Sequence, residues 1–219
     1  MSRTALLACA FVLTASTAAA QTVWTAAPTA QDMAAAYPEK ARAEGVGGGV
    51  ELVCTAARNG AMTDCDVLAE EPRGYGFGVA ARRLAERHMQ AAGVRKDAEV
   101  RVSVSFPAGL AKGETVTVKT PQWTALPTAA EMQALVPKQE GGPNEVRVTL
   151  VCDVAAGGAL TGCVVDREEP AGEGFGEAVL KLAPKFQTGL MSAEGMPTVG
   201  ARVRLPVRFS LTPVDQAAK

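Results

Sequence analysis

The chain has 219 residues, in which 22 lysines and arginines stand against 23 aspartates and glutamates, giving a formal net charge of −1 at pH 7. This balance, with no Lys/Arg cluster, argues against a nucleic-acid partner, because proteins that neutralise a row of phosphates present a concentrated positive surface. Beyond residue 20 the apolar runs are far shorter than the roughly 20 residues that span a bilayer, so we expect no membrane anchor in the mature chain.

Residues 1–20 have the parts of a secretory signal peptide. A short basic start at Met1–Arg3 precedes an apolar stretch at Ala5–Leu13, and Ala18–Ala20 offers an Ala-x-Ala cleavage site. The sequence therefore predicts a mature protein that begins at or near Gln21 and works in the periplasm.

The first predicted elements are a short helix and a β-hairpin. Thr29 and Asp32 form an acidic variant of the capping box that opens a helix. Apolar and polar residues then alternate over 50–55, and a second strand is predicted over 62–68. Between these strands lies Asn59–Gly60, a dipeptide typical of a two-residue hairpin loop.

A second helix and a last strand follow. Over Phe77–Met89 the apolar residues recur at helical spacing, at Phe77, Ala80, Ala81, Leu84 and Ala85. Over 100–106 apolar and polar residues alternate, as in a strand with one buried face. The order helix, strand, strand, helix, strand predicts an α+β module with a three-stranded antiparallel sheet and helices on one face.

The same module occurs a second time. Trp24–Met33 recurs as Trp123–Met132, and Glu70–Gly78 recurs as Glu168–Gly176. The second copy also repeats the apolar helix positions, at Phe175, Ala178, Val179, Leu182 and Ala183. We therefore predict a signal peptide at 1–20, a first module at 21–107, a linker at 108–120, a second module at 121–211 and a tail at 212–219.

Four cysteines of the exported part form two pairs of equal spacing. They are Cys54 with Cys65, and Cys152 with Cys163, eleven residues apart in each pair. An even number of cysteines in an exported chain favours disulfides. A two-residue loop at Asn59–Gly60, or at Gly157–Gly158 in the second copy, places the members of a pair directly opposite each other. We predict two disulfides, each across a hydrogen-bonded strand pair with a Cα separation of about 5.5 Å, a value that a bulge in the hairpin would change.

The residue types that carry catalysis are sparse. His88 is the only histidine, and the second copy has Phe186 in its place, which favours an aromatic packing role over catalysis or metal binding. The paired acids Glu70–Glu71 and Glu168–Glu169 are neighbours on a strand and point to opposite faces, so they are interpreted as solvated residues ahead of a proline turn. Gly76–Ala81 fits the G-x-G-x-x-A pattern but follows an antiparallel hairpin, whereas dinucleotide sites need a parallel βαβ unit. We predict a protein that is not an enzyme and binds no cofactor or metal.

Three features carry a resemblance to a known family. They are the hairpin strand Val50–Cys54, the run Glu-Pro-x-Gly-x-Gly-Phe-Gly in both copies, and Met196–Gly200 ahead of Val203–Phe209. Together they resemble the TonB C-terminal domain family, twice, over nearly the whole mature chain. The resemblance implies a periplasmic domain that offers the edge of its last strand to the TonB box of outer-membrane receptors, coupling inner-membrane energy to import.

A TonB-type transducer needs an uncleaved amino-terminal membrane helix and usually a proline-rich spacer, and we expect neither in the mature chain. The favoured hypothesis is therefore a periplasmic protein-binding protein that captures partner peptides by strand addition in outer-membrane transport or envelope assembly. TonB-dependent outer-membrane receptors are the expected partners. Two alternatives stay open: an energy transducer, if the amino-terminal segment is an uncleaved anchor, and an envelope scaffold that self-associates.

The last strand of each copy is the predicted binding edge. Pro206 lies within that strand of the second copy and has no N–H to donate, so the strand is expected at the edge of its sheet. The backbone groups expected to face an added strand are those of Arg101, Ser103 and Ser105 in the first copy, and of Arg204, Pro206 and Arg208 in the second. Because the first copy has no proline there, we expect its full row of donors to be free and hypothesise that it is the stronger strand-capturing edge.

Overall fold

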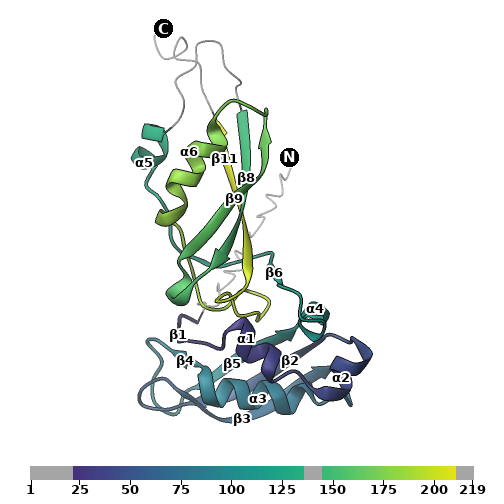
Figure 1. The fold of residues 1–219 in the computed structure, drawn as a ribbon. Coiled ribbons are helices and arrows are strands. Elements are labelled where there is room, and N and C mark those ends of the chain that lie inside the picture. The colour runs from purple at the N-terminus through teal and green to yellow at the C-terminus, as the bar shows by residue number, and fades with distance from the viewer. Residues whose placement is uncertain (1–21, 136–144, 211–219) are drawn as a thin grey trace, which may run out of the picture.

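The computed structural model of the protein describes residues 22–135 and 145–210. The predicted signal peptide and C-terminal tail lie outside these ranges. The described chain forms two lobes, one above the other in Figure 1, each built on a largely antiparallel sheet with helices packed against it. In these ranges, no helix is long and apolar enough to cross a membrane.

The first lobe contains the antiparallel sheet β3-β2-β5 and a small separate pair, β1-β4. Its elements are β1 (Trp24–Ala26), α1 (Ala30–Ala35), α2 (Glu39–Glu44), β2 (Gly48–Ala56), β3 (Met62–Glu71), α3 (Phe77–His88), β4 (Gln90–Ala91) and β5 (Glu99–Phe106). The predicted capping box opens α1, because the Asp32 N–H donates to the Thr29 hydroxyl at 3.1 Å and the Thr29 N–H donates to the Asp32 carboxylate at 2.8 Å. The α+β class and the three-stranded sheet are confirmed here.

The second lobe contains the sheet β6-β11-β8-β9 and the separate pair β10-β7. Its elements are β7 (Trp123–Ala125), α5 (Ala129–Leu135), β8 (Glu145–Val154), η1 (Ala156–Gly158), β9 (Leu160–Glu169), α6 (Phe175–Leu182), η2 (Ala183–Lys185), β10 (Gln187–Thr188) and β11 (Arg202–Ser210).

The segment between the lobes is part of the fold. It contains α4 (Ala108–Ala111) and β6 (Thr117–Val118), and β6 pairs in parallel with Arg202 and Val203 at the start of β11. The prediction of three strands is therefore wrong for the second sheet, which has four. The physical reason is apolar burial, since Val118 is fully buried in this position.

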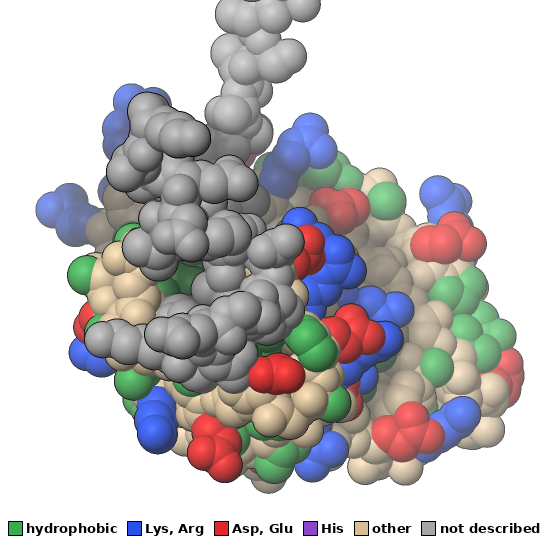
Figure 2. Space-filling view, turned by 90° about the horizontal axis from the view of Figure 1, so that it is seen from above, with side chains coloured by type: hydrophobic (Ala, Val, Ile, Leu, Met, Phe, Trp, Pro, Cys, Tyr) green, Lys and Arg blue, Asp and Glu red, His purple; other side chains and the backbone are tan. Residues whose placement is uncertain are grey.

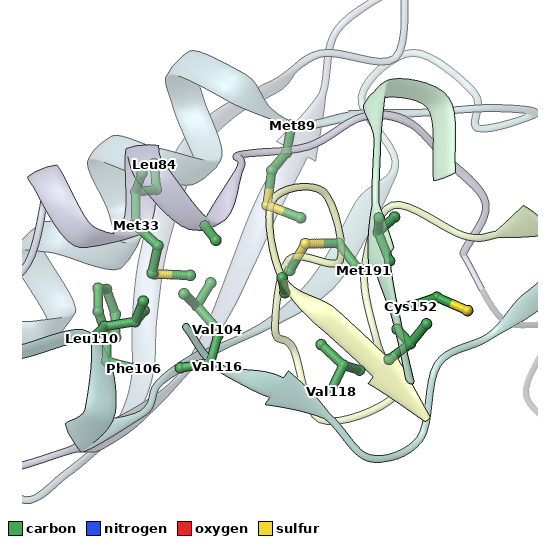
Figure 3. Close-up of a cluster of buried hydrophobic side chains, with 14 of the residues drawn as sticks. Met33, Leu84, Met89, Val104, Phe106, Leu110, Val116, Val118, Cys152 and Met191 are labelled. Carbon is green, nitrogen blue, oxygen red and sulfur yellow. The ribbon is translucent and has the colours of Figure 1, made fainter. Parts of the chain in front are cut away.

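One hydrophobic cluster runs through both lobes. The predicted apolar positions of α3 and α6, with Ala183 at the start of η2, are all buried, and all except Ala178 belong to this cluster, which confirms the helical pattern. Figure 3 shows the middle of the cluster, where Met191 lies between Val104 of the first lobe and Val118 and Cys152 of the second. Burial of one such side chain contributes about 1.5–3 kcal/mol, so apolar contacts hold the lobes together.

The turn between β2 and β3 differs from the two-residue loop predicted at Asn59–Gly60. Residues 57–61 join the strands, and the Gly60 N–H donates to the Ala57 carbonyl at 2.9 Å. The reason is the passage of β4, whose Ala91 N–H donates to the Gly60 carbonyl at 2.9 Å. Gly60 has a φ of +82°, and a Cβ there would stand 2.1 Å from the Ala91 carbonyl oxygen, so the position requires glycine.

Both predicted disulfides are present, as Cys54–Cys65 and Cys152–Cys163. Their Cα separation is 4.0 Å in each case, shorter than predicted. The difference comes from a bulge, because β2 and β3 pair in one register near the turn, at Thr55–Thr63, and in a register shifted by one residue beyond Cys54. The cysteine pairing was predictable, whereas the local register was not.

Candidate protein-binding edges

Within the described chain, β5 is a terminal strand of the first sheet and pairs with β2 alone. The backbone N–H of Ser105 points away from β2, since it donates to the Gly195 carbonyl at 2.9 Å. Backbone groups alternate in direction along a strand, so those of Arg101 and Ser103 point the same way. The structure thus brings the three predicted residues of the first copy to one edge.

A turn from the second lobe occupies one end of this β5 edge. The Gly195 turn (Ser192–Met196) is closed by a hydrogen bond from the N–H of its first residue to the carbonyl of its last, at 2.8 Å. Gly195 has a φ of +77° and lies so close to Ser103 that a Cβ would stand 2.3 Å from the Ser103 carbonyl oxygen. The prediction that every donor of this edge is free is therefore wrong, because the turn already pairs with Ser105.

The rest of the β5 edge opens into a small pocket. It has a volume of about 200 Å³, and its lining includes Arg101 and Ser103, Trp24 of β1, and Met191 beside the Gly195 turn. Among the residues that the structure describes, the outward N–H groups of Arg101 and Ser103 have no hydrogen-bond partner. Strand addition needs free main-chain donors, and Arg101 and Ser103 supply two of them at this pocket.

The prediction that β11 lies at the edge of its sheet is wrong at one end, because β6 covers the β11 edge at Arg202 and Val203. The Arg202 N–H donates to the Val116 carbonyl at 2.9 Å, and β6 continues this contact. Farther along the edge, the side chains of Arg204 and Arg208 form ion pairs, and Pro206 has no N–H to offer. Seen from above, basic and acidic side chains lie next to one another on the surface (Figure 2). The second edge therefore has fewer free donors than the first.

The residues interpreted as non-catalytic have packing and capping positions. His88 ends α3 and is half-buried. The interpretation of the paired glutamates as solvated is wrong for one member of each pair: Glu70 has a buried carboxylate oxygen, and the Glu168 carboxylate accepts the Phe175 N–H at 2.8 Å. A carboxylate at a helix N-terminus interacts favourably with the helix dipole. In the described ranges, no group of three His, Cys, Asp or Glu side chains is placed to hold a metal ion.

The opposite terminal strand of each sheet carries an exposed apolar pair that was not predicted from the sequence. On β3, Val67 and Leu68 are 42% and 49% exposed, and on β9, Val164 and Val165 are 58% and 38% exposed. Two adjacent apolar residues break the alternation of a strand, so one of them faces outward. That break in the pattern was the available signal, because exposed apolar pairs mark candidate contact surfaces.

Comparison with known proteins places the first lobe in a family context. Residues 33–108 match the family described as the Gram-negative bacterial TonB protein C-terminal domain. The chain is also 31% identical over 104 residues to an uncharacterized protein of Caulobacter vibrioides, in an alignment that covers 48% of this chain and 97% of that protein. The family match contains the whole sheet β3-β2-β5 and with it Arg101, Ser103 and Ser105.

Proposed function

The chain belongs to the family of the Gram-negative bacterial TonB protein C-terminal domain, and from this membership we propose that it is a periplasmic protein that captures partner peptides by strand addition at the β5 edge. Domains of this family interact with proteins such as outer-membrane receptors. The proposed setting is outer-membrane transport or envelope assembly, with TonB-dependent receptors as partners. The two disulfides support a location in an oxidising compartment.

The observation that carries this proposal is the pair of unpaired backbone donors at Arg101 and Ser103, beside a pocket whose lining includes Trp24 and Met191. A peptide laid along residues 99–103 would bond to these groups and end where the Gly195 turn begins. The turn supports the same mode of binding, because its carbonyl already accepts from Ser105 as an added strand would. Trp24 and Met191 offer contact area to alternate side chains of the peptide.

Replacing Ser103 with proline tests the proposal. Ser103→Pro removes the outward N–H at a position where β11 naturally carries Pro206, so the sheet should tolerate it. Loss of this hydrogen bond should weaken binding of a synthetic TonB-box peptide by about five- to tenfold. The measurement is a peptide titration followed by amide chemical shifts, which should move at 99–103.

The matched control is Ser103→Ala, which keeps the backbone N–H and should bind within about twofold of the unmodified protein. Circular dichroism establishes that both variants are folded. Unchanged peptide affinity in Ser103→Pro, in a folded protein, rules out the β5 edge as the capture site.

The cellular location is tested separately. Intact-mass measurement on protein from a periplasmic extract should give a chain that starts at or near Gln21. Full-length chain in the inner-membrane fraction would instead support the energy-transducer alternative, which depends on residues outside the described ranges.

A second candidate function, the self-associating scaffold, is favoured by the exposed apolar pairs Val67–Leu68 and Val164–Val165. Sedimentation velocity over a concentration series measures self-association. If the scaffold candidate is right, Leu68→Lys should shift the protein toward monomer. A protein that sediments as a monomer throughout the series removes this candidate.

A further inference from the structure

A groove of about 620 Å³ is lined by residues of α1 and α3, two helices on the same lobe (Figure 1). Its walls include Asp32 and Ala36 on one side, and Val79, Arg83 and Arg87 of α3 on the other. This α1–α3 groove shares no lining residue with the pocket at the β5 edge. We propose that the α1–α3 groove binds an acidic peptide segment of a partner protein that also carries apolar side chains.

Two arginines stand along the α3 wall without an acidic partner. Arg83 and Arg87 are both exposed, and neither forms an ion pair with any residue that the structure describes. The acid of the same helix, Glu86, faces another way, where its carboxylate accepts the Cys65 N–H at 3.4 Å. Like charges four residues apart disfavour a helix on its own. The charge of these arginines is therefore unused within the fold and available to a partner.

The acid on the opposite wall does not neutralise them. The Asp32 carboxylate accepts from both the N–H and the hydroxyl of Thr29, at 2.8 and 2.7 Å. These hydrogen bonds lower the pKa of Asp32 and hold its carboxylate at the N-terminus of α1. His88 adds a further donor-bearing side chain at the end of the groove. The groove keeps an excess of basic groups.

The apolar part of the lining defines the rest of the ligand. Val79 is 46% exposed and stands one turn before Arg83, with Ala36 and the buried Leu84 beside it. A small inorganic anion would leave this surface uncovered. Side chains four apart on a helix are about 5–6 Å apart at Cβ, a spacing close to that of alternate residues on an extended peptide. The fitting segment therefore has two carboxylates separated by one residue, with apolar neighbours.

The described residues of the second lobe do not repeat this arrangement. The corresponding positions are Glu177 and Lys181 of α6 and Lys185 of η2, and Lys185 forms an ion pair with Glu131 of α5 at 3.0 Å. Its charge is balanced by residues of the same lobe, so we expect no acidic-peptide site there. Lys181 is exposed like Arg83 and provides a matched control position.

The test uses the full mature chain and a fluorescein-labelled probe of sequence Leu-Glu-Val-Glu-Leu, followed by anisotropy at low and high salt. The double variant Arg83→Ala, Arg87→Ala should bind the probe about tenfold more weakly, whereas Lys181→Ala should stay within about twofold. A probe with glutamine in place of both glutamates should lose affinity by a similar factor, and salt should weaken the native complex. Circular dichroism verifies that the exposed substitutions leave the fold intact.

Three outcomes overturn the proposal. One is equal binding by the double variant. Another is loss of probe binding in Ser103→Pro, which would make the probe a strand ligand of β5 rather than a groove ligand. The third is failure to bind the probe combined with arginine-dependent binding to phosphatidylglycerol vesicles, which would assign the arginines to a membrane surface. Strand capture at β5 can fail while the groove binds, because the two sites use different residues.

Discussion

The last strands of the two sheets show the same alternation of residues but differ in which part of their edge is covered. The β5 edge is covered near its C-terminal end, where Ser105 pairs with the Gly195 turn, and the β11 edge near its N-terminal end, where Arg202 pairs with Val116. Alternation decides which face of a strand is buried, but segments from elsewhere in the chain decide which backbone donors remain free. The proposal of strand capture on β5 rests on this difference, because the outward N–H groups of Arg101 and Ser103 have no partner among the described residues.

Removal of the disulfides should produce the largest difference in stability between the two sheets. The double variant Cys152→Ala, Cys163→Ala should lower the free energy of unfolding by about 3 kcal/mol, since the disulfide reduces the conformational entropy of the unfolded chain. The variant Cys54→Ala, Cys65→Ala should lose more, because Cys54 and Cys65 are 1% and 2% exposed and their loss leaves a cavity, whereas Cys163 is half-buried. Urea unfolding gives both values. A larger loss in the second sheet would contradict this difference.

Opening the covered end of β5 has the next largest effect. In Gly195→Ala the new Cβ would stand 2.3 Å from the Ser103 carbonyl oxygen at a φ of +77°, so the turn must move away from the edge. The strain is about 1–3 kcal/mol. Hydrogen exchange at Ser105 should become about tenfold faster or more, and TonB-box peptide binding should strengthen because a longer edge is free.

The control for this variant is Gly189→Ala in the same segment. A Cβ at Gly189 would meet nothing closer than 3.6 Å, so the exchange rate of Ser105 should stay as it is. If Gly195→Ala leaves the exchange of Ser105 unchanged, the turn is not what protects this edge.

Restoring the missing donor of β11 should have a smaller effect. Pro206→Ala supplies an outward N–H at the position that corresponds to Ser103, and one added hydrogen bond contributes about 0.5–1.5 kcal/mol. The second edge should then bind the TonB-box peptide several-fold more tightly, in a titration of a protein that also carries Ser103→Pro. No gain would mean that the proline is not what separates the two edges.

The parts of the fold predicted from sequence are those fixed by local patterns. The alternation over 100–106 located β5 and its buried face, the spacing over 77–89 located α3, and Thr29 with Asp32 located the start of α1. The equal spacing of the cysteines located the disulfides, because a covalent pair across a hairpin constrains two positions at once.

The features that were not predicted depend on contacts between distant segments. The turn at Gly60 is shaped by the backbone of Ala91, and the coverage of Ser105 depends on Gly195. Nothing in the neighbouring sequence of Gly60 or Ser105 specifies these partners. The arginines of α3 are an intermediate case. The spacing of Arg83 and Arg87, four residues apart on one helix, follows from the sequence. That neither pairs with Glu86 follows only from the structure, in which the Glu86 carboxylate accepts the Cys65 N–H.

The smallest expected effect concerns Glu131 of the second lobe. This residue forms an ion pair with Lys185, whereas its counterpart Asp32 forms no ion pair with any residue that the structure describes. The Glu131 carboxylate accepts the Thr128 N–H at 2.8 Å and pairs with Lys185 at 3.0 Å. The hydrogen bond from the Thr128 backbone and then the ammonium of Lys185 lower the pKa of Glu131 from 4.5 to about 2. Because the pKa is lower in the folded protein, this stabilisation is complete above pH 4.5 and is lost as the pH falls from there toward 2.

Thermal unfolding of the unmodified protein and of Glu131→Gln, measured over this pH interval, isolates the contribution. Above the interval the variant should be less stable than the unmodified protein. The difference should shrink as the pH falls, because the Glu131 carboxylate of the unmodified protein then becomes protonated in the folded state as well as in the unfolded state. Since the carboxylate is exposed to solvent, the change should be small and should shrink in high salt. Lys185→Ala should reproduce part of it, whereas Arg87→Ala, at the corresponding position of α3, should not, because Arg87 has no such pair. Parallel pH profiles for the unmodified protein and Glu131→Gln would show that the two lobes do not differ in this respect.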